Sequence, residues 1–201
     1  AMKLYIQDLN FSYDNGLIFN NQTHTLSSNR ITLLLGQNGS GKSTFLKIIA
    51  GLEKPNSGSI KLRDNNDKSL KFNGNISYLG HKLALKEELT VQENIKFWHN
   101  FYGKDLLARE FEELGLDKLS SMIVSNLSAG QKKKLALYRI LMSNKDIWLL
   151  DEPFSNLDKK AYGYLRELLL MRLNNDRIII ITSHSKLDLV DKMIINLDVD
   201  L

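Results

Sequence analysis

Nine residues in the first quarter of the chain constrain its fold more than any other feature. Residues 36–44 read Gly-Gln-Asn-Gly-Ser-Gly-Lys-Ser-Thr, the spacing G-x-x-x-x-G-K-[ST] of loops whose inward-turned backbone N–H groups cradle phosphate oxygens. Residues 30–35 form an apolar, strand-like run before this loop, and residues 43–50 continue with helical spacing as far as Gly51, a typical helix terminator. The sequence therefore predicts an α/β fold in which a strand, a phosphate-binding loop and a helix follow one another.

Acidic residues after a second apolar run complete the chemistry of a nucleoside triphosphate site. Residues 147–150 are apolar without alternation, as in a parallel strand buried on both faces, and Asp151 and Glu152 follow directly. The Ser43 hydroxyl and the Asp151 carboxylate are hard oxygen ligands suited to Mg²⁺, and Lys42 is placed to reach the β- and γ-phosphates. Glu152 is the candidate general base for the attacking water. We therefore expect ATP binding and hydrolysis, with Lys42 and Glu152 as catalytic residues.

A serine-led segment begins a later helical pattern. Residues 127–131 read Leu-Ser-Ala-Gly-Gln, and Ser128 can cap a helix that continues through residues 132–141. A capped helix start offers free N–H groups and partial positive charge to an anion, and Ala129 and Gly130 are small enough to allow a close approach. An ordinary capped surface helix is the alternative interpretation.

These motifs stand in the order and spacing of ABC-type ATPases, and the resemblance covers nearly the whole chain. It implies a P-loop core with N-terminal antiparallel strands and an inserted α-helical subdomain. It also implies a head-to-tail homodimer, in which the Leu-Ser-x-Gly-Gln segment of one subunit closes over the nucleotide held by the other. The nucleotide-binding positions that it assigns in this chain are Tyr13, Gly36, Gln37, Asn38, Gly39, Ser40, Gly41, Lys42, Ser43, Thr44, Ser128, Ala129, Gly130 and Gln131.

Three further features take their roles from the same resemblance. His184 follows the apolar residues 178–183 and resembles the family's switch histidine, which contacts the γ-phosphate, so we count it as catalytic. Tyr13 matches the aromatic position that stacks on adenine, an interaction of about 1–3 kcal/mol per base; a core or hairpin aromatic is the alternative. Residues 155–158, Ser-Asn-Leu-Asp, resemble the loop that reports on the opposite site across the dimer, although a plain turn would use the same residues.

One position departs from the family pattern. Family members usually carry glutamine after the strand that enters the helical subdomain, whereas His81 stands there, after residues 75–79. The metal and water contact usually made by that glutamine is therefore in question. The Leu-Gly-His sequence at 79–81 and residues 89–97 resemble one branch of the family, the ATPase subunit of the haem exporter of bacterial cytochrome c maturation.

Composition places the chain among ordinary globular domains. It has 201 residues, of which 43% are hydrophobic and 25% charged, enough for one domain with an ample core. No apolar run approaches the roughly 18 residues of a membrane-spanning helix, and the first residues lack a signal-peptide pattern. The absence of cysteine excludes disulfides and thiolate metal sites and fits a reducing cytoplasm. We expect a soluble protein, bound peripherally to the cytoplasmic face of the inner membrane.

The formal net charge of +4 does not by itself indicate a nucleic-acid partner. Lysines are dispersed among acidic residues, and the one basic run, residues 132–134, lies on the helix after the Leu-Ser-Ala-Gly-Gln segment, where its solvent-facing members would keep the helix soluble. We therefore expect ATP, and not nucleic acid, to be the anionic partner; attraction of the basic run to an anionic membrane surface is a further alternative.

The chain is expected to form a single ABC ATPase domain with two parts. Residues 1–79 and 142–201 alternate strand and helix patterns and would form the α/β core, whereas residues 80–141 would form the helical subdomain. In the family, the groove between these parts receives a short helix of the membrane partner. The candidates for lining it are Leu83, Leu85, Phe97, Trp98 and Phe101, and a core role is their alternative.

Two helices are predicted within the helical subdomain. The first starts at Thr90, with Glu93 at the spacing of a capping box, and continues to Phe101. The second spans residues 105–114, with Asp105 as its cap, Gly115 as its stop and apolar residues that are most simply core.

The predicted function is that of the ATP-binding and ATP-hydrolysing subunit of a bacterial ABC transporter, in which ATP closes a homodimer and hydrolysis reopens it. Its partner would be an integral membrane permease subunit, and the resemblance points to haem export in cytochrome c biogenesis. A soluble assembly ATPase, as in iron–sulfur cluster assembly, is the alternative. A non-enzymatic regulatory subunit would be expected to lack Glu152 or His184, and a DNA-maintenance ATPase would carry a long heptad insertion; the chain has both residues and no such insertion.

Overall fold

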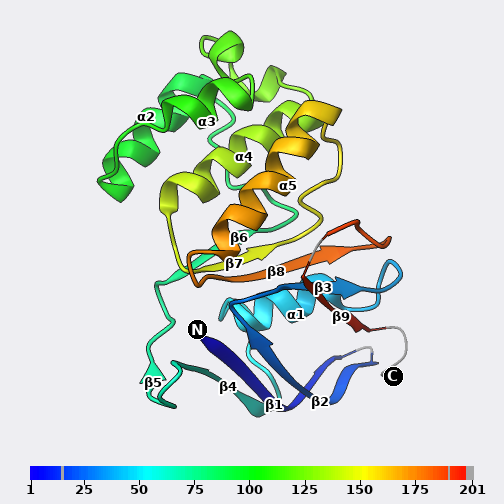
Figure 1. The fold of residues 1–201 in the computed structure, drawn as a ribbon. Helices are drawn as coiled ribbons and strands as arrows, with labels where there is room; N and C mark the ends of the chain where they lie inside the picture. The colour runs from blue at the N-terminus through cyan, green and yellow to red at the C-terminus, as the bar shows by residue number, and fades with distance from the viewer. Residues whose placement is uncertain (15, 190, 198–201) are drawn as a thin grey trace. The chain divides into compact units, whose positions relative to one another are not determined.

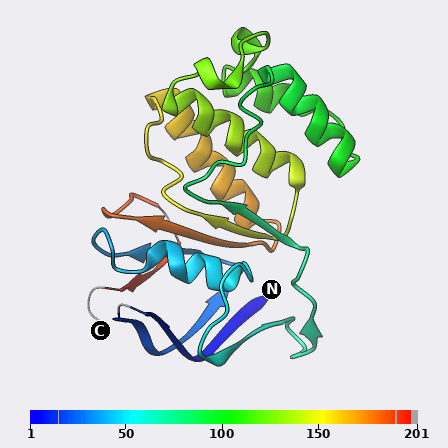
Figure 2. The same ribbon diagram turned by 180° about the vertical axis from the view of Figure 1, so that it is seen from behind.

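The computed structural model describes residues 1–14, 16–189 and 191–197, and the chain divides into two compact units (Figures 1 and 2). The first unit comprises Ala1–Tyr78, Lys145–Glu152 and Leu169–Leu201, and the second comprises Leu79–Asn144 and Pro153–Leu168. Residues 153–168, which the sequence pattern assigns to the α/β core, therefore group with the helical part instead.

Two sheets of different kinds build the first unit (Figure 1). The antiparallel sheet has the order β2-β1-β4-β5, made of β1 (Lys3–Tyr13), β2 (Gly16–Ser27), β4 (Ser57–Arg63) and β5 (Ser69–Leu70). The second sheet has the order β6-β7-β8-β3-β9, made of β3 (Ile31–Leu35), β6 (Ile76–Leu79), β7 (Ile147–Leu150), β8 (Ile178–Ser183) and β9 (Lys192–Asn196). In it, β3 pairs in parallel with β8 and β9, and β7 with β8. The predicted fold class, an α/β core with N-terminal antiparallel strands, is confirmed.

Helix α1 (Lys42–Ile49) lies between the two sheets (Figure 2) and shares one core with both. Its Phe45 and Leu46 are buried in the same cluster as Leu4 of β1 and Ile180 of β8. Burying a side chain of this size stabilises the fold by about 1.5–3 kcal/mol, so the loop that precedes α1 is anchored from both sides. The central strands β7 and β8 are buried along their whole length, as their unalternating apolar sequences predict.

Gly51 terminates helix α1. Gly51 has φ 73°, and its N–H donates to the carbonyl of Ile48 at 3.1 Å while the Leu52 N–H donates to the carbonyl of Lys47 at 2.8 Å. This pair of hydrogen bonds is the Schellman arrangement, in which a left-handed residue after the helix satisfies its last carbonyls. The predicted stop at Gly51 is confirmed.

The second unit is helical, with α2 (Val91–Tyr102), α3 (Ala108–Glu113), α4 (Ala129–Ser143) and the first part of α5 (Lys159–Leu173). The predicted capping box of α2 is confirmed: the Glu93 N–H donates to Thr90 Oγ1 at 3.2 Å, and the Thr90 N–H donates to Glu93 Oε2 at 2.8 Å. Trp98 is 3% exposed and belongs to the core, whereas Phe97 and Phe101 stack on one another at 6.0 Å in the open.

Helix α3 begins at Ala108, so the prediction of a helix capped by Asp105 is wrong. Leu107 has φ −88° and ψ 81°, which is not helical, and its N–H donates to the Tyr138 hydroxyl of α4 at 3.0 Å. Leu106 is 58% exposed and is not a core residue, although Leu114 at the other end is buried. Gly115, with φ 67°, ends the helix as predicted.

The lysine run on α4 does not form a solvent-facing basic patch. Lys132 pairs with Glu87 at 3.1 Å, Lys134 pairs with Asp158, and Lys133 is buried. Two of these lysines therefore make ion pairs with other segments of the same unit and the third is buried; a role of the run in keeping the helix soluble stays a prediction.

Candidate active site

The phosphate-binding loop connects β3 to α1 in the first unit. Gly39 and Gly41 have φ values of 89° and 90°, a region that only glycine adopts at little cost. A Cβ on Gly41 would also lie 2.6 Å from Ile18 Cγ2. Ser40 Oγ is a buried hydroxyl without a hydrogen-bond partner among the described residues. The loop is therefore shaped to turn donors towards an anion at the start of α1.

Lys42 is folded back onto this loop. Its Nζ donates to the carbonyl oxygens of Gly36 at 2.5 Å and Gln37 at 2.9 Å, and the side chain is buried. A buried ammonium group beside free N–H groups creates strong local attraction for phosphate oxygens. The lysine ammonium group thus lies against the glycine loop itself. That Lys42 reaches the β- and γ-phosphates stays a prediction.

Ser43 and Asp151 meet at the C-terminal end of β7. Ser43 Oγ donates to Asp151 Oδ2 at 2.6 Å, and the carboxylate is 1% exposed. A serine hydroxyl and a carboxylate that converge in this way are ligands that fit Mg²⁺, which is usually held by one or two carboxylates together with substrate phosphates. The described residues contain no cluster of three or more acidic, histidine or cysteine side chains for a metal ion.

Thr182 is a site residue that the sequence analysis missed. Its Oγ1 donates to Asp151 Oδ1 at 2.6 Å and accepts the Glu152 N–H at 2.9 Å, and it is fully buried. The only signal was a polar residue near the end of an apolar strand. Thr182 fixes both acidic residues, one through its carboxylate and the other through its backbone.

Glu152 and His184 lie side by side at the ends of β7 and β8. His184 Nδ1 is 3.2 Å from Glu152 Oε2, with the histidine exposed and the glutamate mostly buried. Glu152 has φ 47°, a left-handed conformation that is costly for a residue of this kind and is often found at functional sites. The carboxylate can thus accept a proton while the histidine faces solvent beside it.

Two tyrosines lie near this site, Tyr78 and Tyr13. Burial, reinforced by the charge of Asp151, raises the pKa of Tyr78 to about 12, so it does not titrate near neutral pH. Tyr13 is 41% exposed, packs edge-on against Phe11 at 4.8 Å, and its hydroxyl lies 3.5 Å from Thr44 Oγ1. Tyr13 is therefore not a core aromatic, but it pairs with Gly16 where β1 meets β2, so the hairpin alternative stays open. Its role in stacking on adenine stays a prediction.

The Leu-Ser-Ala-Gly-Gln segment lies in the second unit. Ser128 caps α4 through a full capping box, in which the Gln131 N–H donates to Ser128 Oγ at 3.2 Å and the Ser128 N–H donates to Gln131 Oε1 at 2.9 Å. Ser128 and Ala129 are exposed, and no acidic residue occupies the first turn. The helix start is therefore open and suited to an anion. The capping role of Gln131 was not anticipated from the sequence.

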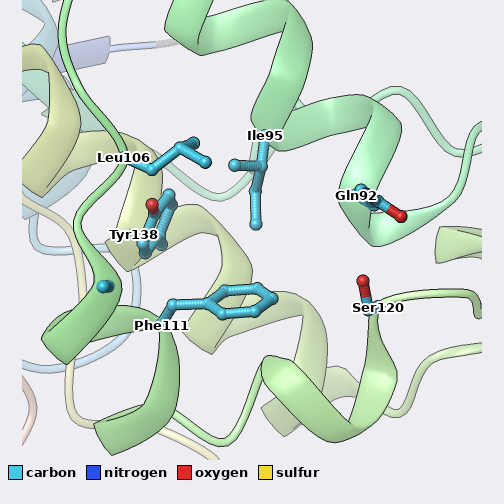
Figure 3. Close-up of a pocket in the computed structure, with 7 residues that line it drawn as sticks. Gln92, Ile95, Leu106, Phe111, Ser120 and Tyr138 are labelled. Atoms are coloured by element: carbon cyan, nitrogen blue, oxygen red, sulfur yellow. The ribbon is translucent and has the colours of Figure 1, made fainter.

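His81, at the position where the family usually has glutamine, is exposed and follows β6 within the second unit. A separate pocket of about 200 Å³ lies in the same unit (Figure 3). Ile95, Leu106 and Phe111 line it together with Tyr138, with Gln92 and Ser120 at its edge. Because none of its lining residues is charged, it does not have the chemistry of a triphosphate site.

No helix in the described part of the chain combines the length and hydropathy needed to cross a bilayer.

The fold and the site define a P-loop nucleoside triphosphatase, and comparison with known proteins narrows the class. The sequence model of the ABC transporter family matches residues 19–155. The Cytochrome c biogenesis ATP-binding export protein CcmA of Rickettsia felis is 35% identical over 96% of this chain and 99% of its own length. The protein of the same name from Rhizobium johnstonii is 35% identical over 86% of this chain and 84% of its own. The chain belongs to the ABC transporter family, as an ABC-type ATPase.

Solved structures agree with this assignment. An ABC transporter ATP-binding protein from Pyrococcus furiosus superposes with a TM-score of 0.80, at 27% identity and with 98% of both chains covered. A dimeric ATP-binding cassette bound to ADP and phosphate has a TM-score of 0.73 at 23% identity, covering 90% of this chain and 88% of the other. The second likeness establishes the shared fold.

Proposed function

We propose that this chain is the ATP-hydrolysing subunit of a bacterial ABC export complex that serves cytochrome c biogenesis. The observation that carries the chemistry is the convergence of Lys42, Ser43, Asp151 and Glu152 around one glycine loop. The cytochrome c assignment rests on the names of relatives that match the chain over nearly its full length.

Each residue of the site has one task in the proposed reaction. Lys42 and the loop N–H groups bind the phosphates of ATP, and Ser43 and Asp151 would hold Mg²⁺, which neutralises charge on the phosphate oxygens. Glu152 accepts the proton of the water that attacks the γ-phosphorus, and His184 beside it contacts the γ-phosphate. Tyr13 stacks on the adenine ring. Thr182 keeps Asp151 and Glu152 in place.

Two copies of the chain are proposed to enclose two ATP molecules head to tail. The open, capped start of α4 supports this arrangement, because Ser128, Ala129 and Gly130 can approach a γ-phosphate held by a second subunit. ATP drives closure only if it binds the closed dimer more tightly than the open one. Hydrolysis removes the γ-phosphate contacts from both subunits and releases the dimer.

The proposed membrane partner is an integral permease subunit, with this chain bound peripherally at the cytoplasmic face of the inner membrane. The helical unit carries exposed apolar side chains suited to such a contact. Phe101 is 70% exposed and stacks with Phe97. The Lys86 ammonium group lies 4.2 Å from the centroid of the Phe97 ring. Leu83 and Leu85 are partly exposed in the same unit, whereas the buried Trp98 is not proposed for this surface.

A pull-down tests the proposal. The Glu152→Gln variant, supplied with Mg-ATP, is recovered from detergent-solubilised membranes of its native host and its partners are identified by mass spectrometry. Lys42→Ala, treated in the same way, is the control for nucleotide dependence. We expect an integral membrane subunit together with cytochrome c maturation proteins. A different permease would overturn the cytochrome c assignment, and only soluble iron–sulfur assembly proteins would overturn the transport function.

A further inference from the structure

A close contact with the backbone of Asn156 leaves room only for glycine at position 130. A Cβ built on this second residue of α4 would lie 2.4 Å from the backbone carbonyl oxygen of Asn156, a separation that no carbon and oxygen tolerate without movement. The φ angle of Gly130 is not in the left-handed region, so the missing side chain serves close approach and not backbone conformation. The loop 153–158 therefore rests directly on the first turn of α4.

A second contact from the same helix face holds the same loop. Lys134 lies one turn after Gly130, at the i, i+4 spacing that places two residues on one face. Its Nζ pairs with Asp158 Oδ2, and the lysine side chain is only 17% exposed. Lys132, two positions earlier, pairs instead with Glu87 on another segment. Of these two lysines, Lys134 is the one that contacts the loop.

The loop itself has a defined conformation. Asn156 has φ 62°, a left-handed geometry that asparagine tolerates better than most residues. Asp158 Oδ1 accepts the Ala161 N–H at 2.9 Å and so caps the start of α5, while Phe154 packs against Tyr162 with ring centroids 4.6 Å apart. A fixed loop transmits a displacement, whereas a flexible one would absorb it.

We infer that Gly130 and Lys134 are positioning residues that lock the loop 153–158 to the start of α4, so that the two segments move as one body. The loop follows Glu152, the proposed base, directly in the chain. When the start of α4 binds a nucleotide, it therefore also positions the backbone that follows Glu152. This inference deepens the proposed ATPase function and rests on it. Lys134 acts through Asp158 and needs no contact with ATP.

The packing part is tested in the nucleotide-free protein. Hydrogen–deuterium exchange of the amides in 154–158 is measured for wild type, Gly130→Ala and Gly163→Ala. Gly163 lies on α5, where a Cβ would have no neighbouring atom within 4 Å. Gly163→Ala is therefore the control for replacing glycine by alanine in a helix, which by itself is stabilising. We expect faster exchange of the loop in Gly130→Ala alone. Unchanged exchange in that variant would overturn the inference.

The positioning part is tested by steady-state ATP hydrolysis. Lys134→Gln is expected to lower kcat about tenfold, as for a slightly misplaced catalytic group, while KM for ATP stays within about twofold. Lys134→Arg restores most of kcat because it keeps the charge at the same site, and Lys132→Gln serves as the control on the same helix. An unchanged kcat in Lys134→Gln would overturn the inference.

The two arms separate this inference from the proposed function. A wild-type protein that hydrolyses no ATP would contradict the proposed function, and with it the positioning role of Lys134. An active wild type whose Gly130→Ala and Lys134→Gln variants match it would contradict the inference alone. Thermal melting of every variant shows that a lower kcat does not come from an unfolded chain.

Discussion

At the scale of single residues, Lys42 is the side chain on which nucleotide binding depends most. It is buried against the loop carbonyls of Gly36 and Gln37, where its charge adds to the partial charge of the helix start. Removing a hydrogen bond to a charged group costs about 1.5–3 kcal/mol. Lys42→Ala should therefore weaken Mg-ATP binding about tenfold or more by calorimetry. Lys47→Ala, in the last turn of the same helix, is the control, and equal affinity of the two variants would contradict the role of Lys42.

Thr182 makes a second prediction at this scale. Valine has the same shape but would leave Asp151 Oδ1 and the Glu152 N–H without the partner they have now, in a buried position. Each unsatisfied group costs about 1–3 kcal/mol, so Thr182→Val should lower the free energy of unfolding by that order and reduce kcat. Urea denaturation measures the first effect. Thr182→Ser retains the hydroxyl, so its free energy of unfolding should fall much less. A Thr182→Val protein as stable as wild type would contradict the bridging role of Thr182.

Which residues could be predicted depends on how local their chemistry is. The glycine loop, Lys42 and Ser43 were recognisable because the loop binds through consecutive backbone groups, and Asp151 and Glu152 because a buried strand ends beside them. Thr182 was missed because its role depends on the pairing of β7 with β8, where Leu150 lies opposite Ile181. The contact between Gly130 and Asn156 is equally non-local, and no sequence pattern predicts it.

At the scale of elements, the capping box of α2 predicts a pH effect. The hydrogen bonds from the Thr90 backbone and side chain lower the pKa of Glu93 below its ordinary 4.5. Because the folded state binds this proton less readily than the unfolded state, the stabilisation is present above the ordinary value and is lost as the pH falls through the folded pKa. The difference in unfolding free energy between wild type and Glu93→Ala should therefore shrink between pH 7 and pH 3.

The control for this experiment is Glu88→Ala, which removes an exposed carboxylate that lies outside the capping box. Its effect on stability should change less over the same pH range. A difference between wild type and Glu93→Ala that stays constant down to pH 3 would show that the ionised carboxylate does not stabilise the helix start.

The helices differ in how well their ends could be predicted from the sequence. The ends of α1 and α2 were predicted because caps act within a few residues, through Gly51 in one case and Thr90 with Glu93 in the other. The start of α3 was not: Asp105 does not cap it, and the residue before the helix, Leu107, contacts Tyr138, 31 positions away in the chain. Local signals therefore defined the ends of helices only where the tertiary structure did not compete with them.

At the scale of the whole molecule, the chain combines two units whose segments alternate along the sequence. Glu152 ends a segment of the first unit and Pro153 begins a segment of the second. Sequence patterns distinguished helices from strands but placed residues 153–168 in the α/β core. In the structure these residues group with the helical unit, through contacts with α4 such as Lys134 with Asp158. The peptide after the proposed base is thus also the point at which the chain passes from one unit to the other.

The molecular mass of Glu152→Gln in the presence of Mg-ATP, measured by light scattering during size-exclusion chromatography, tests the central claim most directly. Glutamine keeps the size of Glu152 but cannot accept the proton, so ATP should bind without being consumed and hold two subunits together. We predict a dimer with Mg-ATP, a monomer without nucleotide, and a monomer for the double variant that also carries Lys42→Ala. A Glu152→Gln protein that remains monomeric at saturating Mg-ATP would contradict the account of ATP-driven dimer closure.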